Sequence, residues 1–505
     1  MKDLTAVAHK ARPEGVERYQ MWIGGDWVDA ASGETFLSED PYTGKPWAEL
    51  PRAGAADVDK AVAAARAAFA SWKRTKPQQR AKLMMKLADL VEANADSLAT
   101  IEVLDNGKLF AEMSGQCRYI AEYFRYYAGA ADKLHGQTIP TDKPDIFNFT
   151  RYEPLGVIGM IVPWNSPLLL LSWKLAPALA TGNVAVIKPS EFTSASTLHF
   201  MELVEAAGIP PGVVNVVTGF GAEVGGPLVD HPDVAKIAFT GSDDTGARIY
   251  AAAAKGIKHV CLELGGKSPN IVFADADPDA AVSGVISGIL AASGQTCIAG
   301  SRLLLHNDIH DAFLDRLVNA VGRARLGDPM LPDTNVGPVA TRPQFAKVLE
   351  YIDVAKNDGA DLALGGSAYS GPGTDGDQFV SPTIFAGVNN EMRIAREEVF
   401  GPVLAVIPFK DDEDAYRIAN DTAFGLGAGV WTQDLSRAIT ASEEIESGTV
   451  WVNTYRMVSY TSPFGGYKRS GLGREGGFDA MREYTQTKSV WMCTKPNTGD
   501  PFVMR

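Results

Sequence analysis

The sequence lacks the features typical of secreted, membrane-spanning and nucleic-acid-binding proteins. Its 505 residues include only four cysteines, which are scattered and form no C-x-x-C pair, so a disulfide framework is excluded. No stretch approaches the roughly 18 apolar residues needed to cross a bilayer. The net charge is −14, which repels nucleic acid and anionic membrane surfaces, and no run of Lys and Arg forms a basic segment. We expect a globular protein without membrane or nucleic-acid partners.

Two further absences bear on the compartment and on metals. Residues 1–20 are polar and charged without an apolar core, so we expect no signal peptide and a cytoplasmic location. Of seven histidines only His306 and His310 lie close together, and the residues between them lack the glutamate of H-E-x-x-H. A solvated surface pair is the better interpretation, and we predict no metal site.

What is present is an alternation of strand-like and helix-like segments. An amphipathic helix is predicted over 57–72, and from residue 152 short apolar runs alternate with helical patterns. The predicted strands are 157–162, 184–188, 213–217, 236–240 and 260–263, and the predicted helices are 168–180, 193–207, 222–229 and 245–255. Such alternation indicates a parallel sheet covered by helices, which binds ligands at the carboxyl ends of its strands.

A second α/β series follows Gly265. Its predicted strands are 270–273, 302–305 and 403–408. The length of the chain suggests about three domains. From the two α/β series we expect two α/β lobes with a cleft between them.

The segment 294–297, Gly-Gln-Thr-Cys, holds the most informative cysteine. It follows a helical stretch of small residues and precedes a predicted strand, so Cys297 is predicted to lie in a turn. A thiolate presented to a cleft there is a strong nucleophile for a carbonyl carbon. The alternative is a buried structural cysteine, which is our interpretation of Cys117, Cys261 and Cys493.

Two other segments place polar side chains at strand ends. Glu263 ends a predicted strand before two glycines, which let the backbone pass close to a ligand. Its carboxylate either activates a water or is a solvated charge. Asn165, in Pro-Trp-Asn-Ser-Pro, follows a strand and opens a helix. Its amide either donates to a developing oxyanion or caps the helix.

Glycine-rich segments give weaker signals for a dinucleotide. The glycines of 219–225 are one residue too far apart for G-x-G-x-x-G. Gly241 and Ser242 follow a strand and open a helix, which suits a pyrophosphate. In the segment 188–191, also at a strand end, an acidic side chain either accepts hydrogen bonds from a ribose diol and repels a 2′-phosphate, or is a solvated charge.

Taken in order, these segments resemble the aldehyde dehydrogenase superfamily. The order and approximate spacing match, and Glu-Glu-Val-Phe-Gly-Pro at 397–402 and Pro-Phe-Gly-Gly-Tyr-Lys at 463–468 add to the match. The resemblance extends from about residue 22 to 491. It implies an α/β fold with a Rossmann-like cofactor domain, an α/β catalytic domain and a small β oligomerisation arm.

The resemblance also implies a reaction: NAD-dependent oxidation of an aldehyde to a carboxylic acid through a thioester. Cys297 would attack the aldehyde, the Asn165 amide and the Cys297 N–H would hold the oxyanion, and Glu263 would activate the hydrolytic water. The implied NAD-binding residues are Trp164, Lys188, Ser190, Glu191, Gly221, Gly241, Ser242, Gln344, Lys347, Glu398 and Phe400. The residues implied to line the aldehyde tunnel are Tyr119, Trp173, Thr296, Ile298, Arg456, Val458 and Phe464.

Arg456 is an unusual member of this set. It either recognises a carboxylate or another polar tail on the substrate, or it folds outward to solvent. Substrate identity depends on this choice.

The implied domains are an NAD-binding domain at 1–131 and 153–265 and a catalytic domain at 266–484. An arm and tail occupy 132–152 and 485–505. Arms of this kind join subunits by strand addition, so we expect a homodimer or homotetramer.

Three alternative functions remain at this stage. A CoA-acylating semialdehyde dehydrogenase is disfavoured because relatives of that type generally lack the glutamate found at Glu263. A cysteine hydrolase lacks a histidine in a segment that would pair with Cys297. A noncatalytic NAD-binding relative would not need Cys297, Glu263 and Asn165 together.

Overall fold

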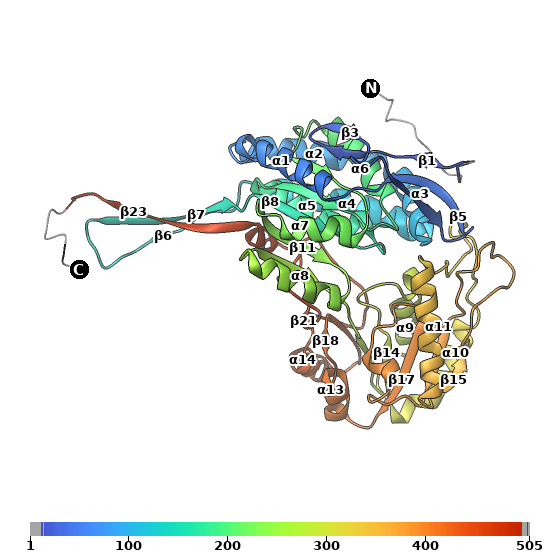
Figure 1. Cartoon of the computed structure of the whole chain (residues 1–505). Helices are drawn as coiled ribbons and strands as arrows, with labels where there is room; N and C mark the ends of the chain where they lie inside the picture. Colours follow the sequence, from blue (N-terminus) through green and yellow to red (C-terminus); the bar gives the residue numbers. More distant parts are fainter. Residues whose placement is uncertain (1–11, 14, 497–501, 503–505) are drawn as a thin grey trace.

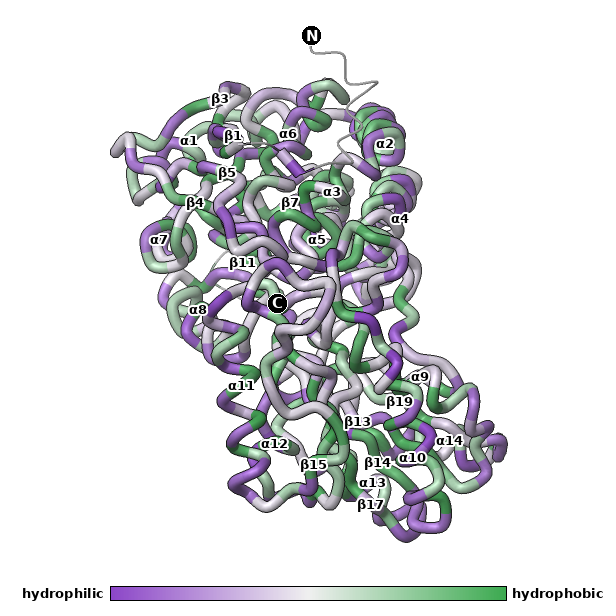
Figure 2. Tube along the Cα trace, turned by 90° about the vertical axis from the view of Figure 1, so that its right-hand side faces the viewer, coloured by the Kyte–Doolittle hydropathy of each residue, from purple (hydrophilic) through white to green (hydrophobic). Residues whose placement is uncertain are grey.

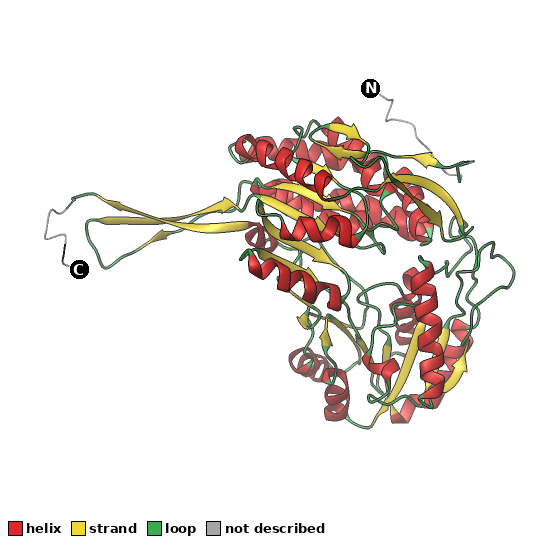
Figure 3. Cartoon of the chain, in the orientation of Figure 1, coloured by secondary structure: helices red, strands yellow, loops and turns green. Residues whose placement is uncertain are grey.

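The chain folds into two α/β lobes and a long three-stranded arm (Figure 1). The computed structural model describes residues 12–13, 15–496 and 502. Residues 1–11, 14, 497–501 and 503–505 lie outside the described residues. They include parts of the N-terminal segment 1–20 and of the predicted tail. Four helices follow one another over residues 55–130, and from residue 157 onward strands and helices alternate through both lobes, as the sequence pattern predicts (Figure 3).

The first lobe is built on an eight-stranded sheet ordered β22-β12-β11-β8-β9-β10-β2-β3. Its five central strands are parallel and confirm the five predicted strands: β8 (Val157–Ile161), β9 (Val184–Lys188), β10 (Val214–Val216), β11 (Val234–Thr240) and β12 (His259–Glu263). The edge strands are antiparallel: β2 (Met21–Ile23), β3 (Asp26–Val28) and β22 (Gly471–Leu472). With two or three residues each, these edges are too short to show a hydrophobic period in the sequence.

Helices cover both faces of this sheet. One face carries α1 (Ala55–Trp72), α7 (Gly226–Asp230) and α8 (Asp243–Lys255). The other carries α5 (Pro167–Thr181) and α6 (Ala195–Ala207), with α2 (Pro77–Ala93), α3 (Ala95–Asn106) and α4 (Phe110–Ala130) packed outside them. The predicted helix over 222–229 is a π-helical turn, η1 (Gly221–Gly225), followed by α7.

The strand order places a topological switch point between β8 and β11. The chain runs from β8 to β9 and β10 in one direction and then returns to β11 on the other side of β8. Because the five strands are parallel, their carboxyl ends meet at one edge of the sheet. Ligands of such sheets bind at the switch point of this edge.

The second lobe holds a seven-stranded sheet ordered β15-β16-β17-β14-β13-β19-β20, parallel except for β15 (Asp361–Leu364). The parallel strands are β13 (Pro269–Val272), β14 (Arg302–His306), β16 (Thr383–Ala386), β17 (Val403–Phe409), β19 (Gly427–Trp431) and β20 (Thr449–Val452). Its helices are α9 (Pro278–Leu290), α10 (His310–Val321), α11 (Arg342–Asn357), α12 (Arg393–Arg396), α13 (Asp412–Asn420) and α14 (Leu435–Glu444). Hydrophobic residues gather on its central strands (Figure 2), and the predicted second α/β series is confirmed.

The arm extends away from both lobes. It pairs β7 (Ile146–Pro154) with β23 (Thr485–Cys493) along their whole length, as predicted, and β6 (Thr138–Ile139) borders β7. Phe147 and Trp491 are exposed on it. The prediction that Cys493 is buried is wrong, because this residue ends β23 on the projecting arm. A small separate sheet joins β1 (Glu17–Arg18), β5 (Lys45–Pro51) and β4 (Thr35–Asp40).

In the part of the chain that the structure describes, no helix is both long enough and apolar enough to pass through a bilayer.

Candidate active site

Cys297 lies in a turn between α9 and β14, as the sequence predicts. The turn follows a 3₁₀ segment, η2 (Ala291–Gly294), in which Ala292 and Ser293 have φ angles of +53° and +54°. Left-handed backbone at such residues costs about 1–3 kcal/mol each. The Glu112 carboxylate accepts from the Ala292 N–H (3.1 and 3.2 Å), and Ser293 Oγ donates to the Gly337 carbonyl (2.9 Å). These contacts hold the nucleophile's loop in one strained conformation.

Gln295 connects this loop to the first lobe. Its Nε2 donates to the Ala292 carbonyl (3.2 Å) and its Oε1 accepts from the Ala340 N–H (2.9 Å). Its own carbonyl accepts from Asn165 Nδ2 (3.0 Å). Asn165 lies in the bend after β8, and the residue at the N-cap of α5 is Ser166. The helix-cap alternative for Asn165 is therefore wrong.

The orientation of the Asn165 amide suits an oxyanion donor. The amide group carries two N–H donors. One is fixed by the Gln295 carbonyl, and the residue lines the same cavity as Cys297. A donor that is held in place before the reaction stabilises developing charge without reorganisation.

We expect Asn165→Ala to lower kcat by about a hundredfold or more, because a missing oxyanion donor costs roughly 2.7–4 kcal/mol in comparable sites. Steady-state turnover of an aldehyde with saturating NAD measures the effect. NAD binding, followed by quenching of protein fluorescence, is the control and is expected to be unchanged. A loss of less than threefold would remove Asn165 from this role.

Glu263 is buried at the end of β12, and neither carboxylate oxygen has a hydrogen-bond partner among the described residues. The solvated-charge alternative is therefore wrong. A side chain on Gly465 would come within 2.9 Å of Glu263 Oε1, so the carboxylate packs against that glycine. Glu263 lines neither of the two cavities described below.

A buried ion pair beside Glu263 has no strong signal in the sequence. Lys174 Nζ, on α5, contacts Glu475 Oε1 (2.6 Å) and Thr240 Oγ1 (2.6 Å), and both charged side chains are fully buried. Burial and then the Glu475 carboxylate raise the pKa of Glu263 well above its usual range, whereas Lys174 lowers it. Burial and Glu475 thus favour the protonated form of Glu263, and Lys174 opposes them.

We expect Glu475→Gln to move the acid limb of kcat to lower pH, because one negative charge beside Glu263 is lost. Lys174→Met is the opposite variant and should move the limb to higher pH, since the charge that favours ionised Glu263 is removed. The pH profile of kcat under conditions in which hydrolysis limits turnover checks both. Shifts in the same direction would contradict this electrostatic account.

The thiol of Cys297 is not ionised by its surroundings alone. Burial, then the carboxylates of Glu398 and Glu263, raise the pKa of Cys297 to about 12. Two glycines bring these groups close: a side chain on Gly265 would collide with the Glu398 carboxylate, and one on Gly266 with the Cys297 carbonyl. The thiol is protonated at neutral pH in this state, so it needs a base or a nearby positive charge to become a nucleophile.

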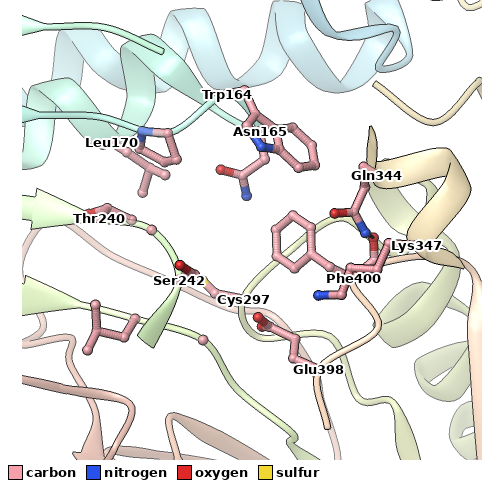
Figure 4. A pocket seen from close by; sticks show the side chains of 14 residues that line it. Trp164, Asn165, Leu170, Thr240, Ser242, Cys297, Gln344, Lys347, Glu398 and Phe400 are labelled. Carbon is pink, nitrogen blue, oxygen red and sulfur yellow. Dashed lines mark hydrogen bonds between the residues drawn. The ribbon is translucent and has the colours of Figure 1, made fainter. Parts of the chain in front are cut away.

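A cavity of about 140 Å³ opens at the carboxyl edge of the first sheet and ends at Cys297. Figure 4 shows side chains of both lobes converging on it. Seven predicted cofactor residues line it: Trp164, Gly241, Ser242, Gln344, Lys347, Glu398 and Phe400. The rings of Trp164 and Phe400 meet edge to face with centroids 5.3 Å apart.

The lining groups are already positioned by their own contacts. Glu398 Oε1 accepts from the Gly266 N–H (2.9 Å), and burial raises the pKa of Glu398 to about 7. Gln344 Nε2 donates to the carbonyls of Val399 (2.8 Å) and Phe400 (3.0 Å). Gln344 therefore fixes the Phe400 loop in addition to lining the cavity.

Four predicted cofactor residues do not line this cavity: Lys188, Ser190, Glu191 and Gly221. They follow β9 and β10 at the same edge of the sheet. Lys188 is buried, and its Nζ donates to Glu191 Oε2 (2.8 Å). The Lys188–Glu191 pair therefore adds two polar side chains to this edge of the sheet, on the β9 side of the switch point.

A second cavity, of about 440 Å³, reaches Cys297 from between α4, α5 and the loop after β20. All seven predicted tunnel residues line it: Tyr119, Trp173, Thr296, Ile298, Arg456, Val458 and Phe464. Ser166 and Leu169 line it too, and so do Glu112 and Gln116 of α4, which no motif indicated. Asn165, Leu170 and Cys297 line both cavities. Cys297 thus lies where the two cavities meet.

Among the described residues, no group of three or more His, Cys, Asp or Glu side chains is arranged to hold a metal ion.

A doubly wound sheet with a cavity at its switch point, and a cysteine that lines this cavity and a second one, are typical of a Rossmann-like enzyme that uses a dinucleotide. The particular family follows from the sequence as a whole. The profile of the aldehyde dehydrogenase family matches residues 27–490, and this chain belongs to that family.

Individual relatives agree over nearly the full length. An aldehyde dehydrogenase of Aspergillus niger is 48% identical over 495 residues, which cover 97% of this chain and 98% of that protein. A Bacillus cereus aldehyde dehydrogenase solved as an NAD+ complex is 44% identical, with a TM-score of 0.92 and coverage of 95% and 97%. Betaine aldehyde dehydrogenase of Staphylococcus aureus, solved in complex with NAD+, is 38% identical, with a TM-score of 0.94 and coverage of 96% and 97%.

Proposed function

We propose that this chain oxidises an aldehyde to a carboxylic acid with NAD+ as acceptor and water as the acyl acceptor. One observation carries the proposal: Cys297, beside Asn165, lines both the cavity at the sheet edge and the tunnel between α4 and α5. A nucleophile in that position touches a carbonyl that enters from one side and a cofactor that enters from the other. Neither a hydrolase nor a binding protein needs this junction.

The side chains of the site divide the work as follows. The Cys297 thiol gives its proton to a water molecule and its sulfur bonds to the aldehyde carbon as the carbonyl π bond opens, and the resulting oxyanion accepts from the Asn165 amide and the Cys297 N–H. Bound NAD+ supplies the hydride acceptor. Glu263 takes a proton from the water that attacks the thioester, and release of the acid returns the thiol. Lys174 and Glu475 set the proton affinity of Glu263.

The residues at the sheet edge suit a dinucleotide. Ser242 caps α8, whose N-terminus faces the cavity and favours a pyrophosphate. A side chain on Gly241 would collide with the Phe239 ring, so only glycine lets the chain pass here. Lys188 and Glu191 are placed to bind the adenosine ribose, with Ser190 and Gly221 beside them. The carboxylate of Glu191 would repel the 2′-phosphate of NADP, so NAD is the expected cofactor.

The test is product analysis with the purified chain. The expected result is NADH formation with an aldehyde and NAD+, and incorporation of one labelled oxygen into the acid from heavy-oxygen water. Formation of acyl-CoA when CoA is added would instead show the CoA-acylating reaction. Binding of NAD+ without turnover of any aldehyde would show a noncatalytic relative, and a higher kcat/KM with NADP would contradict the role given to Glu191.

We also propose that the chain assembles as a homodimer or homotetramer through its arm. The outer edge of β23 pairs with no other described strand, and Trp491 and Met492 on it are exposed. An apolar edge of this kind is a template for strand addition. Light scattering coupled to size-exclusion chromatography measures the mass, and a monomer at micromolar concentration would contradict the proposal.

We divide the chain into an NAD-binding domain at 1–131 and 153–265, a catalytic domain at 266–484, and the arm and tail. The two sheets support this division, with one exchange: β22 adds to the edge of the first sheet beside β12.

A further inference from the structure

One wall of the tunnel is polar, although most of its lining is apolar. Three polar side chains reach it from two elements: Glu112 and Gln116 on α4, and Arg456 in the loop between β20 and β21 (Tyr467–Lys468). The other walls are formed by Tyr119, Leu169, Leu170, Trp173, Ile298, Val458 and Phe464. A tunnel for plain alkyl aldehydes would not need this polar wall.

Arg456 is held in the tunnel wall with hydrogen-bonding capacity to spare. Its Nη1 donates to the Ser287 carbonyl (3.3 Å), while its Nε is buried and has no hydrogen-bond partner. In the described part of the chain, no carboxylate forms an ion pair with Arg456. Its backbone is left-handed, with φ of +65°, which is a costly conformation for arginine. A strained backbone that directs an incompletely paired cation into a cavity points to a ligand.

The neighbouring groups do not neutralise this charge. Glu112, the acidic group of the tunnel wall, keeps its charge but forms no ion pair with Arg456 among the described residues, and its two oxygens accept from the Ala292 N–H. Lys108, behind Ser166, is another cation, and it donates to Ser166 Oγ (2.7 Å). Gln116 adds a buried Oε1 without a partner, which is an acceptor. The wall therefore offers a guanidinium for an anion and an amide oxygen for a hydroxyl or N–H.

We propose that the tunnel selects aldehydes whose far end carries a carboxylate, and that Arg456 is the residue that recognises it. The carboxylate accepts from the Arg456 guanidinium while the aldehyde carbon lies at Cys297. A hydroxyl or amide N–H on the same tail donates to Gln116 Oε1. This inference rests on the proposed aldehyde oxidation and adds its substrate class.

The experiment compares kcat/KM for an ω-carboxy aldehyde and its methyl ester, which has the same chain length without the charge. We expect the native enzyme to prefer the acid, and Arg456→Gln to lower kcat/KM for the acid about tenfold or more, mainly through KM, while the ester changes little. Arg456→Lys keeps the charge and should recover part of the loss. Arg66→Gln is the matched control, because it removes an arginine from the exposed surface of α1 without altering the tunnel.

The outcomes separate this inference from the proposed function. If neither substrate is oxidised by the native enzyme, the proposed function fails. If both are oxidised but Arg456→Gln affects them equally, or if the ester is preferred, the tunnel does not read a carboxylate and the inference is overturned. Near-ultraviolet circular dichroism of the variant shows whether the loop remains folded. A loss confined to the acid supports recognition by Arg456.

Discussion

Cys297→Ala is expected to abolish aldehyde oxidation, with kcat reduced by on the order of 10⁴-fold or more, because no other nucleophile lines the junction of the two cavities. Of the other cysteines, Cys117 and Cys261 are buried elsewhere and Cys493 lies on the arm. None of them is placed to take over. NADH formation measures the loss.

The matched control is Cys261→Ala, which removes a thiol that lines neither cavity. Cys261→Ala should leave turnover within about twofold of the native enzyme, because shortening a side chain that lines neither cavity acts on stability more than on catalysis. NAD+ binding to Cys297→Ala should persist, because the groups around the cofactor cavity remain. Substantial turnover by Cys297→Ala would mean that the covalent mechanism is wrong.

Glu263→Gln is expected to separate the two halves of the reaction. The variant retains Cys297 and Asn165, so the thioester should form and release a burst of about one NADH per active site. Hydrolysis should then slow by about 10²–10⁴-fold, the usual contribution of a general base. Rapid mixing with excess aldehyde resolves the burst from the slow phase.

Two additions make this result decisive. Hydroxylamine, a nucleophile that needs no general base, should restore multiple turnovers by capturing the acyl group. Intact mass spectrometry of the protein during the slow phase should show the acyl adduct. If Glu263→Gln gives no burst, the glutamate acts before thioester formation, and its role as the hydrolytic base would be contradicted.

Much of the fold follows from hydrophobic periodicity. The five parallel strands of the first lobe and the helices between them lie within a few residues of their predicted bounds, because each buried strand is a short apolar run closed by a turn. Hydrophobic periodicity does not reveal edge strands such as β22. Their two or three residues pair with distant parts of the chain, and pairing at long range leaves no local pattern.

The candidate site also contains residues that the sequence reveals and residues that it does not. Cys297, Glu263 and Asn165 stand out because they occur at strand ends in a recognisable order. The burial of Lys174 and Glu475 as a pair does not, since they are 301 residues apart and each looks like an ordinary charge in its own segment. Gln295 gives no signal either, because its importance lies in contacts with distant parts of the chain: its backbone carbonyl accepts from Asn165 of the first lobe, and its side-chain oxygen accepts from the Ala340 N–H.

The pKa of Cys297 is another property that depends on the fold. Sequence reasoning treats the cysteine as a ready thiolate. In the structure, burial first and then the carboxylates of Glu398 and Glu263 raise the pKa of Cys297, which keeps the thiol protonated. Because only spatial neighbours set this balance, spacing along the chain carries no information about it.

Because the two cavities meet at the Cys297 sulfur, they determine how ligands enter and leave the site. A dominant core cluster runs from β8 and β9 of one lobe into β14 of the other, so the lobes are joined by continuous packing. Substrate and cofactor can reach Cys297 through different cavities, one on each side of the sulfur. A carboxylate product can depart through the tunnel while the dinucleotide still occupies the opposite side, and neither exchange obstructs the other.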